Sequence, residues 1–256
     1  MNATSPDNGS GKQLTGKVPR EAIRLFDIPR VPKAVIDGFL SLGDMTSTVS
    51  DAMDEIGLFG VVPASKLRPT IPGAKIVGPA LTLRNIEQPF QAYKGAQDRA
   101  SRLAEIEAHN LAAPGDVLVI EGIADISNMG GISSTIAKRQ GEAAAIVDGA
   151  IRDVAESIAI GFPRWASSIS PITGKWRIQT VEINGPIHIC GVPVKPGDIV
   201  VADADGVCFV PREHVELVLK RSLEIRDGEK RRYDDIRAGV PVPELAQKTY
   251  VYKFEK

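Results

Sequence analysis

Apolar residues recur along this chain at two spacings, one typical of helices and one typical of strands. Helical spacing predicts helices over residues 32–42, 47–56, 91–112, 132–140, 153–160 and 213–234. Alternation and short apolar runs predict strands over residues 74–84, 117–120, 144–147, 164–168, 181–183, 187–190, 199–202 and 207–210. Helices and strands mix at first, β structure dominates later, and a charged helix follows. This order predicts an α/β protein with layered β/β/α architecture rather than a doubly wound sheet.

Composition divides the chain into four parts. Residues 1–18 are rich in Ser, Gly, Asn and Thr, which predicts a disordered tail. Residues 19–34 are expected to form an N-terminal arm, residues 35–220 the main domain, and residues 221–256 a helical extension. Within the body, Ser47 is expected to cap the second helix and Gly57 to end it.

Charge and composition exclude several classes of protein. Hydrophobic residues make up 43% of the chain, which is enough for a sizeable core. A net charge of -1 argues against a general binder of nucleic acid or membrane surfaces. No apolar run is long enough for a bilayer, and the N-terminus lacks the apolar region of a secretory signal. Two cysteines suit free thiols in a reducing compartment, so we expect a cytoplasmic protein without nucleic-acid or membrane partners.

The stretch from Asn128 to Asp153 carries the candidate chemistry. It opens with Gly130 and Gly131 before a predicted helix, and a helix N-terminus can receive an anion. A short strand and an Asp148-Gly149 turn are expected next. The stretch closes on Arg152-Asp153, where Arg can clamp a carboxylate and Asp can hold a hard metal ion.

Two interpretations of Arg152-Asp153 stand side by side. In the first, Asp153 caps the following helix and Arg152 lies on the surface. In the second, one helix and one returning strand bring the glycine pair and the Arg-Asp pair to the same edge of the sheet. The glycine pair upstream favours the second interpretation, a small site for a carboxylate substrate.

Other motifs predict structure rather than chemistry. The corner over residues 203–206 has two of the acidic positions of a calcium loop but lacks its central Gly and final Glu, so a turn between strands is expected. The histidines, which lack paired spacing, are not expected to be metal ligands or catalytic bases: His109, His188 and His214. Ser133-Ser134 lacks the elbow of a serine hydrolase, and no nucleotide-binding motif occurs.

Six segments, in order, resemble the RraA-like family, which includes class II pyruvate aldolases acting on 4-hydroxy-4-methyl-2-oxoglutarate and 4-carboxy-4-hydroxy-2-oxoadipate. The segments are residues 46–54, 78–84, 114–122, 130–133, 146–153 and 194–207. The resemblance extends over about residues 35–218. It implies a swivelling β/β/α fold, a homotrimer or a homohexamer of stacked trimers, and a site at the subunit interface.

The resemblance also implies roles for individual residues. The segment that matches the family's substrate-binding turn, whose N–H groups would receive the pyruvyl carboxylate, is Gly130, Gly131, Ile132 and Ser133. Arg152 matches the substrate-binding arginine and Asp153 the metal-binding aspartate, and both residues are expected to be catalytic. Many members carry an acidic residue where this chain has Gly131.

The expected activity follows from these roles. Asp153 and several waters would hold Mg²⁺ or Mn²⁺, with Glu156 available to hydrogen-bond a metal-ordered water. A small 2-keto acid would bind the metal ion, and carbon–carbon cleavage would leave a pyruvate enolate stabilised by the metal and Arg152. Oxaloacetate decarboxylation passes through the same enolate and is an expected side activity. No lysine falls at the Arg-Asp pair or the glycine turn, so a Schiff-base mechanism is not expected.

Two alternatives remain open from the sequence. One is a non-catalytic trimeric regulator of the RraA type that binds an RNA-processing enzyme. The other is a lyase or hydratase acting on a sugar-derived keto acid through the same enolate.

Overall fold

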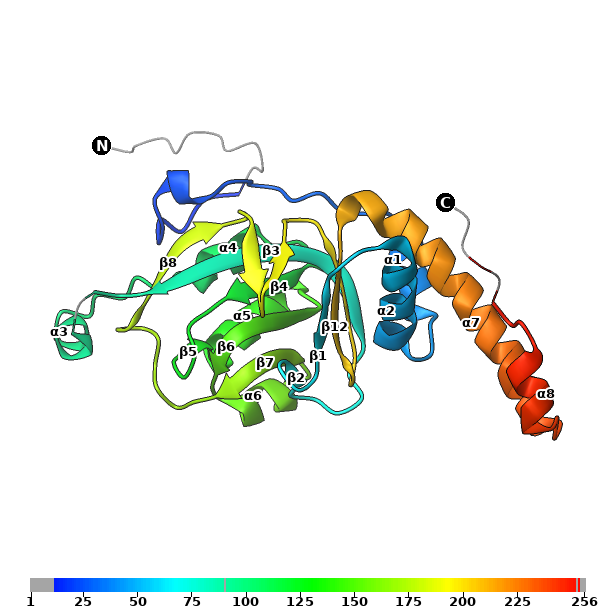
Figure 1. Ribbon diagram of the computed structural model, residues 1–256. Helices are drawn as coiled ribbons and strands as arrows, with labels where there is room; N and C mark the ends of the chain where they lie inside the picture. Colours follow the sequence, from blue (N-terminus) through cyan, green and yellow to red (C-terminus); the bar gives the residue numbers. More distant parts are fainter. Residues whose placement is uncertain (1–11, 90, 252, 254–256) are drawn as a thin grey trace.

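The computed structural model describes residues 12–89, 91–251 and 253, and it shows a layered α/β protein (Figure 1). Its strands are β1 (Val61–Pro63), β2 (Arg68–Pro69), β3 (Ile76–Glu87), β4 (Val117–Glu121), β5 (Ser127–Met129), β6 (Ala144–Ile151), β7 (Arg164–Ile169), β8 (Ile178–Ile183), β9 (Ile187–Ile189), β10 (Val192–Val194), β11 (Ile199–Ala202) and β12 (Gly206–Val210). Its helices are α1 (Lys33–Leu40), α2 (Met45–Ile56), α3 (Ala92–Gln97), α4 (Glu105–Leu111), α5 (Gly131–Gln140), α6 (Val154–Ala159), α7 (Val215–Arg237) and α8 (Val242–Gln247), with 3-10 turns at Arg20–Ala22 and Arg212–His214.

The main sheet is parallel at its centre and antiparallel at both ends. Its order is β1-β12-β11-β3-β4-β6-β7-β2, with β5 beside β6 and β8 beside β3. Strands β3, β4, β6 and β7 pair in parallel, whereas β11 pairs antiparallel with both β3 and β12. Strands β9 and β10 form a separate pair. This mixed sheet with its helices confirms the predicted α/β class.

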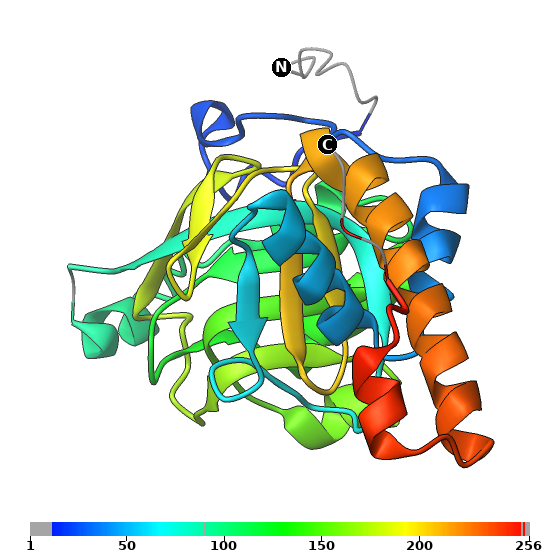
Figure 2. The same ribbon diagram turned by 45° about the vertical axis from the view of Figure 1, so that its right-hand side comes forward.

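Alternation along the central strand separates two cores. Leu118 and Ile120 of β4 pack toward α4 and α5, while Val117 and Val119 pack toward β9, β11 and β12. All four side chains are fully buried. A third cluster lies beyond β11 and β12, whose other face contacts α1, α2 and α7. Figure 2 shows these helices covering that end of the sheet, so the molecule has helices on two sides of stacked β structure.

The predicted helix over residues 91–112 is wrong as a single element. It consists of α3 and α4, and the segment between them includes Arg99, which has a φ of 50°. In that segment Arg102 forms a bridge to Gln179, and the N–H of Ala104 donates to Oγ1 of Thr180. Contacts with the β8 region therefore outweigh the helical pattern of small apolar residues.

The predicted Asp148-Gly149 turn is also wrong, because β6 runs through both residues. The β6–β7 register shifts between Val147 and Ala150, which marks a bulge. A side chain at Gly149 would meet Nδ2 of Asn128 at 2.5 Å, so the strand needs glycine there. An Asp-Gly pair can thus mark a bulge inside a strand as well as a turn.

Helix ends follow the sequence in part. Gly57 ends α2 in the left-handed conformation, as predicted. Ser47 does not cap this helix, because α2 begins at Met45 and Asp203 accepts a hydrogen bond from the N–H of Thr46. The corner between β11 and β12 is the predicted turn over residues 203–206.

The N-terminal segments lie along the body of the protein. Residues 1–11 of the expected tail lie outside the described residues. Lys12 donates to the carbonyl groups of Leu111 and Ala112 at the end of α4, and Val18 is buried. Arg30 of the arm forms two hydrogen bonds to Asp116. In the described part of the chain, no helix is both long and apolar enough to cross a membrane.

Candidate functional site

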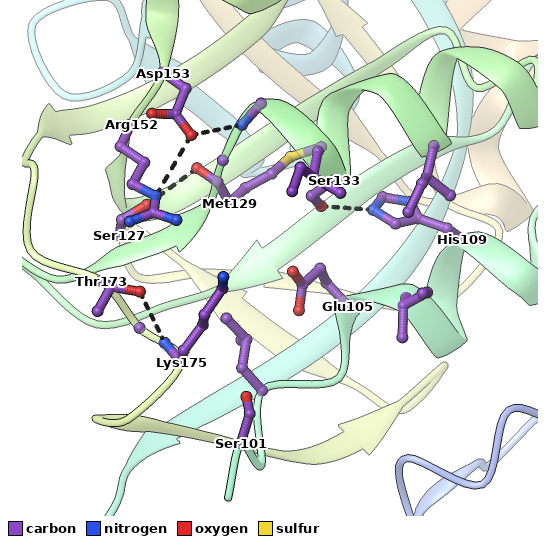
Figure 3. Close-up of a pocket in the computed structure, with 17 residues that line it drawn as sticks. Ser101, Glu105, His109, Ser127, Met129, Ser133, Arg152, Asp153, Thr173 and Lys175 are labelled. Carbon is purple, nitrogen blue, oxygen red and sulfur yellow. Dashed lines mark hydrogen bonds and ion pairs between the residues drawn. The ribbon is translucent and has the colours of Figure 1, made fainter. Parts of the chain in front are cut away.

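The two halves of the Asn128–Asp153 stretch meet at one edge of the sheet. Strand β5 precedes Gly130, strand β6 precedes Arg152, and these two strands pair in parallel. Their carboxyl ends therefore lie side by side, which is where open α/β sheets commonly bind ligands. The N–H of Gly131 donates a 2.9 Å hydrogen bond to Oδ2 of Asp153 (Figure 3). The structure therefore brings the glycine pair and the Arg-Asp pair together, as the second interpretation of the sequence predicts.

Both glycines lie in close contact with the Arg-Asp pair and its surroundings. A Cβ at Gly130 would lie 2.9 Å from Oδ2 of Asp153 and 3.1 Å from Nε of Arg152. A Cβ at Gly131 would lie 3.2 Å from side-chain atoms of Asp153 and Glu156. A side chain at position 130 would require the Asp153 carboxylate to shift, and one at position 131 would require its neighbours to give by a few tenths of an ångström.

The start of α5 presents backbone donors. The first intrahelical bond runs from the N–H of Ser134 to the carbonyl of Gly130, so the N–H groups of Ile132 and Ser133 precede the helical ladder. The N–H of Gly131 is already used by Asp153. The donors at this turn that suit an external anion are therefore those of Ile132 and Ser133.

Asp153 makes no side-chain cap to its own helix α6. It adopts the left-handed conformation, with a φ of 54°, and its carboxylate turns toward α5 instead. Nε of Arg152 lies 3.5 Å from Oδ2 of Asp153, and the two side chains are 30% and 48% exposed. A carboxylate and a guanidinium thus stand adjacent and accessible.

A buried arginine, which the sequence did not single out, forms hydrogen bonds to the backbone of this pair. Arg164 begins β7 and is fully buried. Its guanidinium donates to the backbone carbonyls of Arg152 and Asp153 and to Oγ of Ser157. Burial lowers the pKa of Arg164 to about 10, an effect that the Asp153 carboxylate opposes. A single Arg at a strand start carries no sequence signal for such a role.

These groups border a pocket of about 280 Å³ between α4, the start of α5 and the segment before β8. Figure 3 shows Glu105 and Lys175 opposite Arg152 and Asp153, with their polar ends turned into the same space. Glu105 is half-buried, and loss of water around it raises the pKa of its carboxyl group. His109, Lys175 and Arg152 oppose this shift. The sequence shows no lysine at the Arg-Asp pair or the glycine turn, but in the fold Lys175 lines the same pocket.

A chain of three buried polar side chains leads away from the pocket. Nε2 of His109 lies 2.8 Å from Oγ of Ser133, and Nδ1 of His109 lies 2.7 Å from Oε1 of Glu142. His109 is on α4, Ser133 is on α5 and Glu142 follows α5. Their sequence separation hid this arrangement, because no motif joins the three residues.

The carboxylate expected to hold a metal ion is that of Asp153. Among the described residues, no three His, Cys, Asp or Glu side chains cluster closely enough to hold a metal ion. The Asp153 carboxylate is 48% exposed beside the pocket, whereas the Glu105 carboxylate is half-buried, and a site with one carboxylate and several waters is common for Mg²⁺. Glu156 is exposed on α6 and does not line the pocket. Its suggested contact with a metal-ordered water stays a prediction.

Comparisons with known proteins match most of this structure. The model of the RraA-like family, described as Aldolase/RraA, matches residues 46–209. A protein of Halalkalibacterium halodurans, provisionally named 4-hydroxy-4-methyl-2-oxoglutarate aldolase, is 36% identical over 69% of this chain and 77% of its own length. The protein DlpA of Legionella pneumophila is 29% identical over 81% of this chain, which spans only 32% of that longer protein.

Solved structures show the same fold. An uncharacterised protein of Pseudomonas syringae has a TM-score of 0.71 at 24% identity, covering 86% of this chain and all of that chain. RraAS2 of Streptomyces coelicolor, described as an unusual member of the RNase ES inhibitor RraA family, has a TM-score of 0.65 at 24% identity over 79% and 96% of the two chains. With the family match over more than half of its length, this chain belongs to the RraA-like family.

Proposed function

We propose that the protein is a divalent-metal-dependent lyase that cleaves a carbon–carbon bond of a small 2-keto acid through a pyruvate enolate. One observation carries the proposal: the Arg152 guanidinium and the Asp153 carboxylate stand together at the start of α5, on a pocket of about 280 Å³. The aldolase name of a relative 36% identical to this chain supports the same reaction class.

Each group at the pocket has a part in this reaction. The N–H groups of Ile132 and Ser133 would receive the substrate carboxylate at the start of α5. Arg152 would hold the oxygen on which negative charge develops as the bond breaks. Asp153 would hold Mg²⁺ or Mn²⁺ together with waters. When bound, the ion supplies positive charge that stabilises the enolate.

The substrate class follows from the size and charge of the pocket. A dicarboxylic keto acid of the 4-hydroxy-4-methyl-2-oxoglutarate type has a pyruvyl end for Arg152 and a second carboxylate that could reach Lys175. Oxaloacetate loses CO₂ through the same enolate, so decarboxylation is a proposed side activity. A homotrimer or homohexamer, which sedimentation would measure, is part of the same proposal.

The test is a screen of 2-keto acids with Mg²⁺ or Mn²⁺, monitored by pyruvate release. Arg152→Gln is expected to lower kcat/KM by about 10²–10³-fold, because removal of one donor to a developing oxyanion has that effect. Asp153→Asn is expected to lower the rate and to weaken Mn²⁺ binding measured by electron paramagnetic resonance. Arg139→Gln, an exposed change on α5, is the matched control.

Lys175 allows a sharper version of the test. If the reaction used a Schiff base, borohydride would trap pyruvate on Lys175, and Lys175→Met would abolish trapping. We expect no trapping and a requirement for added metal. Covalent trapping without metal would contradict the proposal, as would unchanged activity of Asp153→Asn. If the protein released pyruvate from none of the keto acids, this result would contradict the lyase and favour a non-catalytic regulator.

A further inference from the structure

We infer that Ser133, His109 and Glu142 form a proton relay, in which the Ser133 hydroxyl takes and returns the proton of carbon–carbon cleavage. This inference rests on the proposed function and supplies the general base that Arg152 and Asp153 do not provide. Ser133 lines the pocket beside the N–H groups proposed to receive the substrate. His109 also lines this pocket, but Ser133 is the member of the relay that belongs to the turn proposed to receive the substrate, so its hydroxyl is placed to touch substrate.

The contacts run in one line from the pocket to the core. Ser133 contacts Nε2 of His109 at 2.8 Å, and the opposite ring nitrogen contacts Glu142 at 2.7 Å. Each of the three residues is at least nine-tenths buried: they are 6%, 0% and 4% exposed. Since Glu142 is a carboxylate acceptor, Nδ1 carries the hydrogen and Nε2 is free to accept one from Ser133.

Glu142 has a further property that suits a relay. Its second oxygen, Oε2, is buried without a hydrogen-bond partner among the described residues. The side-chain partner of this carboxylate is therefore His109, through Oε1. A buried carboxylate with so few donors stabilises a positive charge on its partner more than a fully paired one would. The Glu142 carboxylate thus lies next to the ring that receives the proton from Ser133.

A purely structural role explains less of this geometry. Buried polar side chains cost free energy unless they are fully paired, and apolar residues would pack α4 against α5 without that cost. The same hydrogen bonds do hold the two helices together. What a packing role leaves unexplained is that the chain of contacts ends at a hydroxyl on the pocket.

The proton transfer balances without an added reactant. The substrate O–H bond breaks, and its proton passes to Oγ of Ser133 as the serine proton passes to Nε2 of His109. The electron pair of the O–H bond forms the new carbonyl group, and the pair of the broken carbon–carbon bond becomes the enolate. Return of a proton to the enolate carbon through the same groups gives pyruvate and restores the neutral relay.

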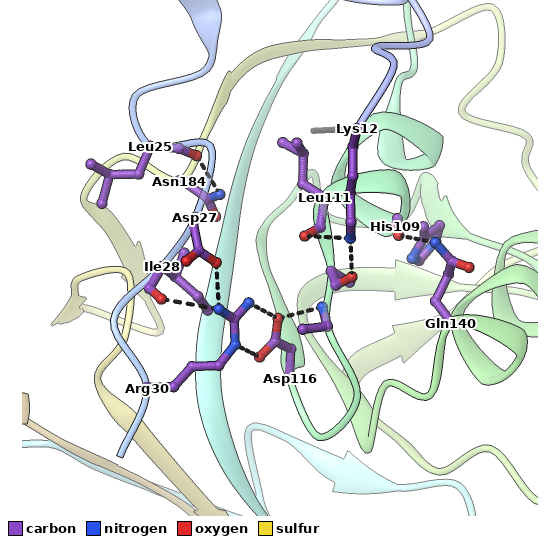
Figure 4. Close-up of polar contacts among 12 residues, drawn as sticks. Lys12, Leu25, Asp27, Ile28, Arg30, His109, Leu111, Asp116, Gln140 and Asn184 are labelled. Carbon is purple, nitrogen blue, oxygen red and sulfur yellow. Dashed lines mark hydrogen bonds and ion pairs between the residues drawn. The ribbon is translucent and has the colours of Figure 1, made fainter. Parts of the chain in front are cut away.

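Other charged groups surround the relay. Glu105 lies one turn before His109 on the same helix, and Arg152 and Lys175 act on Glu105 from the other sides of the pocket. The backbone carbonyl of His109 accepts a hydrogen bond from Gln140 of α5 at 3.0 Å (Figure 4). This contact ties the two helices independently of Ser133, so loss of the serine hydroxyl alone leaves α4 and α5 connected.

The test uses the full-length protein and two measurements. One is kcat and KM for the keto acid identified by the substrate screen, and the other is exchange of pyruvate methyl hydrogens with deuterium, followed by NMR. Ser133→Ala is expected to lower kcat and the exchange rate by about 10²-fold or more, the usual contribution of general acid–base catalysis, with KM changed less than about threefold. Ser134→Ala, whose hydroxyl donates to the carbonyl of Gly130, is the matched control.

His109→Gln and Glu142→Gln test the positioning residues. Each is expected to lower kcat, and the double variant Ser133→Ala with His109→Gln is expected to be no slower than the worse single variant, because the groups act as one unit. Additive losses in kcat would overturn the relay. If the His109 variants do not fold, Ser133→Ala alone decides: kcat and exchange within about threefold of the wild-type protein would refute the relay. A wild-type protein that releases no pyruvate would refute the proposed function instead.

Discussion

The guanidinium of Arg164 donates a 3.0 Å hydrogen bond to the backbone carbonyl of Arg152. One fully buried arginine thus supports the backbone of a second arginine that borders the pocket. The same guanidinium reaches the carbonyl of Asp153, which stands in a left-handed conformation that few aspartates adopt. The geometry of the Arg-Asp pair therefore depends on a residue outside the pocket.

Arg164→Met is expected to destabilise the protein by about 2–4 kcal/mol, because the carbonyls of Arg152 and Asp153 lose a buried donor. The proposed activity should fall at least about tenfold even where the variant remains folded. Chemical denaturation and kcat/KM would measure the two effects. Arg139→Met, at an exposed position of α5, is the control, and equal behaviour of the two variants would contradict the supporting role.

Gly130→Ala tests the close approach at the start of α5. Its Cβ would lie 2.9 Å from Oδ2 of Asp153, so the carboxylate must move. A displacement of about 1 Å can lower the rate by about 10²-fold, and we expect a loss of 10- to 10²-fold in kcat/KM with weaker Mn²⁺ binding. Gly43→Ala serves as the control, since no atom lies within 4 Å of its added methyl group.

Glu105 predicts a pH dependence of stability. In the folded protein, burial raises the pKa of the Glu105 carboxyl group above its ordinary value of 4.5. Ionisation of Glu105 therefore costs folding free energy. Its stabilising effect is complete below pH 4.5 and is lost as the pH rises through the higher folded value. Glu105→Gln stays neutral, so it should match the wild-type Tm near pH 4 and exceed it at pH 8. The exposed change Glu156→Gln is the control, and a parallel pH profile for both variants would contradict the effect of burial.

The N-terminal arm is expected to depend on Arg30. Its guanidinium forms two hydrogen bonds to Asp116, which is fully buried (Figure 4). Arg30→Met leaves that carboxylate without its cation and should cost about 2–4 kcal/mol. Lys33→Met removes only an exposed pair with Asp37 and should cost less than about 1 kcal/mol. Hydrogen exchange over residues 24–30 would rise in the first variant only; an equal rise in both would show that Asp116 does not anchor the arm.

The sequence predicts those parts of the site that follow from local order along the chain. Gly130, Gly131, Arg152 and Asp153 each follow a strand, and two parallel strands must bring their ends together. The broken helix over residues 91–112 was missed because its interruption depends on contacts with the distant strand β8. Local spacing contains no information about such contacts.

The buried groups that position the site could not be predicted from the sequence either. His109 reaches Ser133 across 24 residues and Glu142 across 33, and only the packing of α4 on α5 joins them. Arg164 shows the same difficulty, because its role depends on burial at a strand start rather than on a motif. Sequence patterns favour groups that face ligands over the groups that position them.

The hydrogen bond from Gly131 to Asp153 has a thermodynamic consequence. One backbone donor at the positive end of α5, the N–H of Gly131, already serves Asp153, so a carboxylate that binds the N–H groups of Ile132 and Ser133 also meets the negative charge of Asp153. A carboxylate that arrives with a divalent cation meets a ligand instead. For the proposed reaction, metal and keto acid are therefore expected to bind with positive cooperativity, each raising the affinity for the other by the same factor. The free protein would then discriminate against simple carboxylates in the absence of metal.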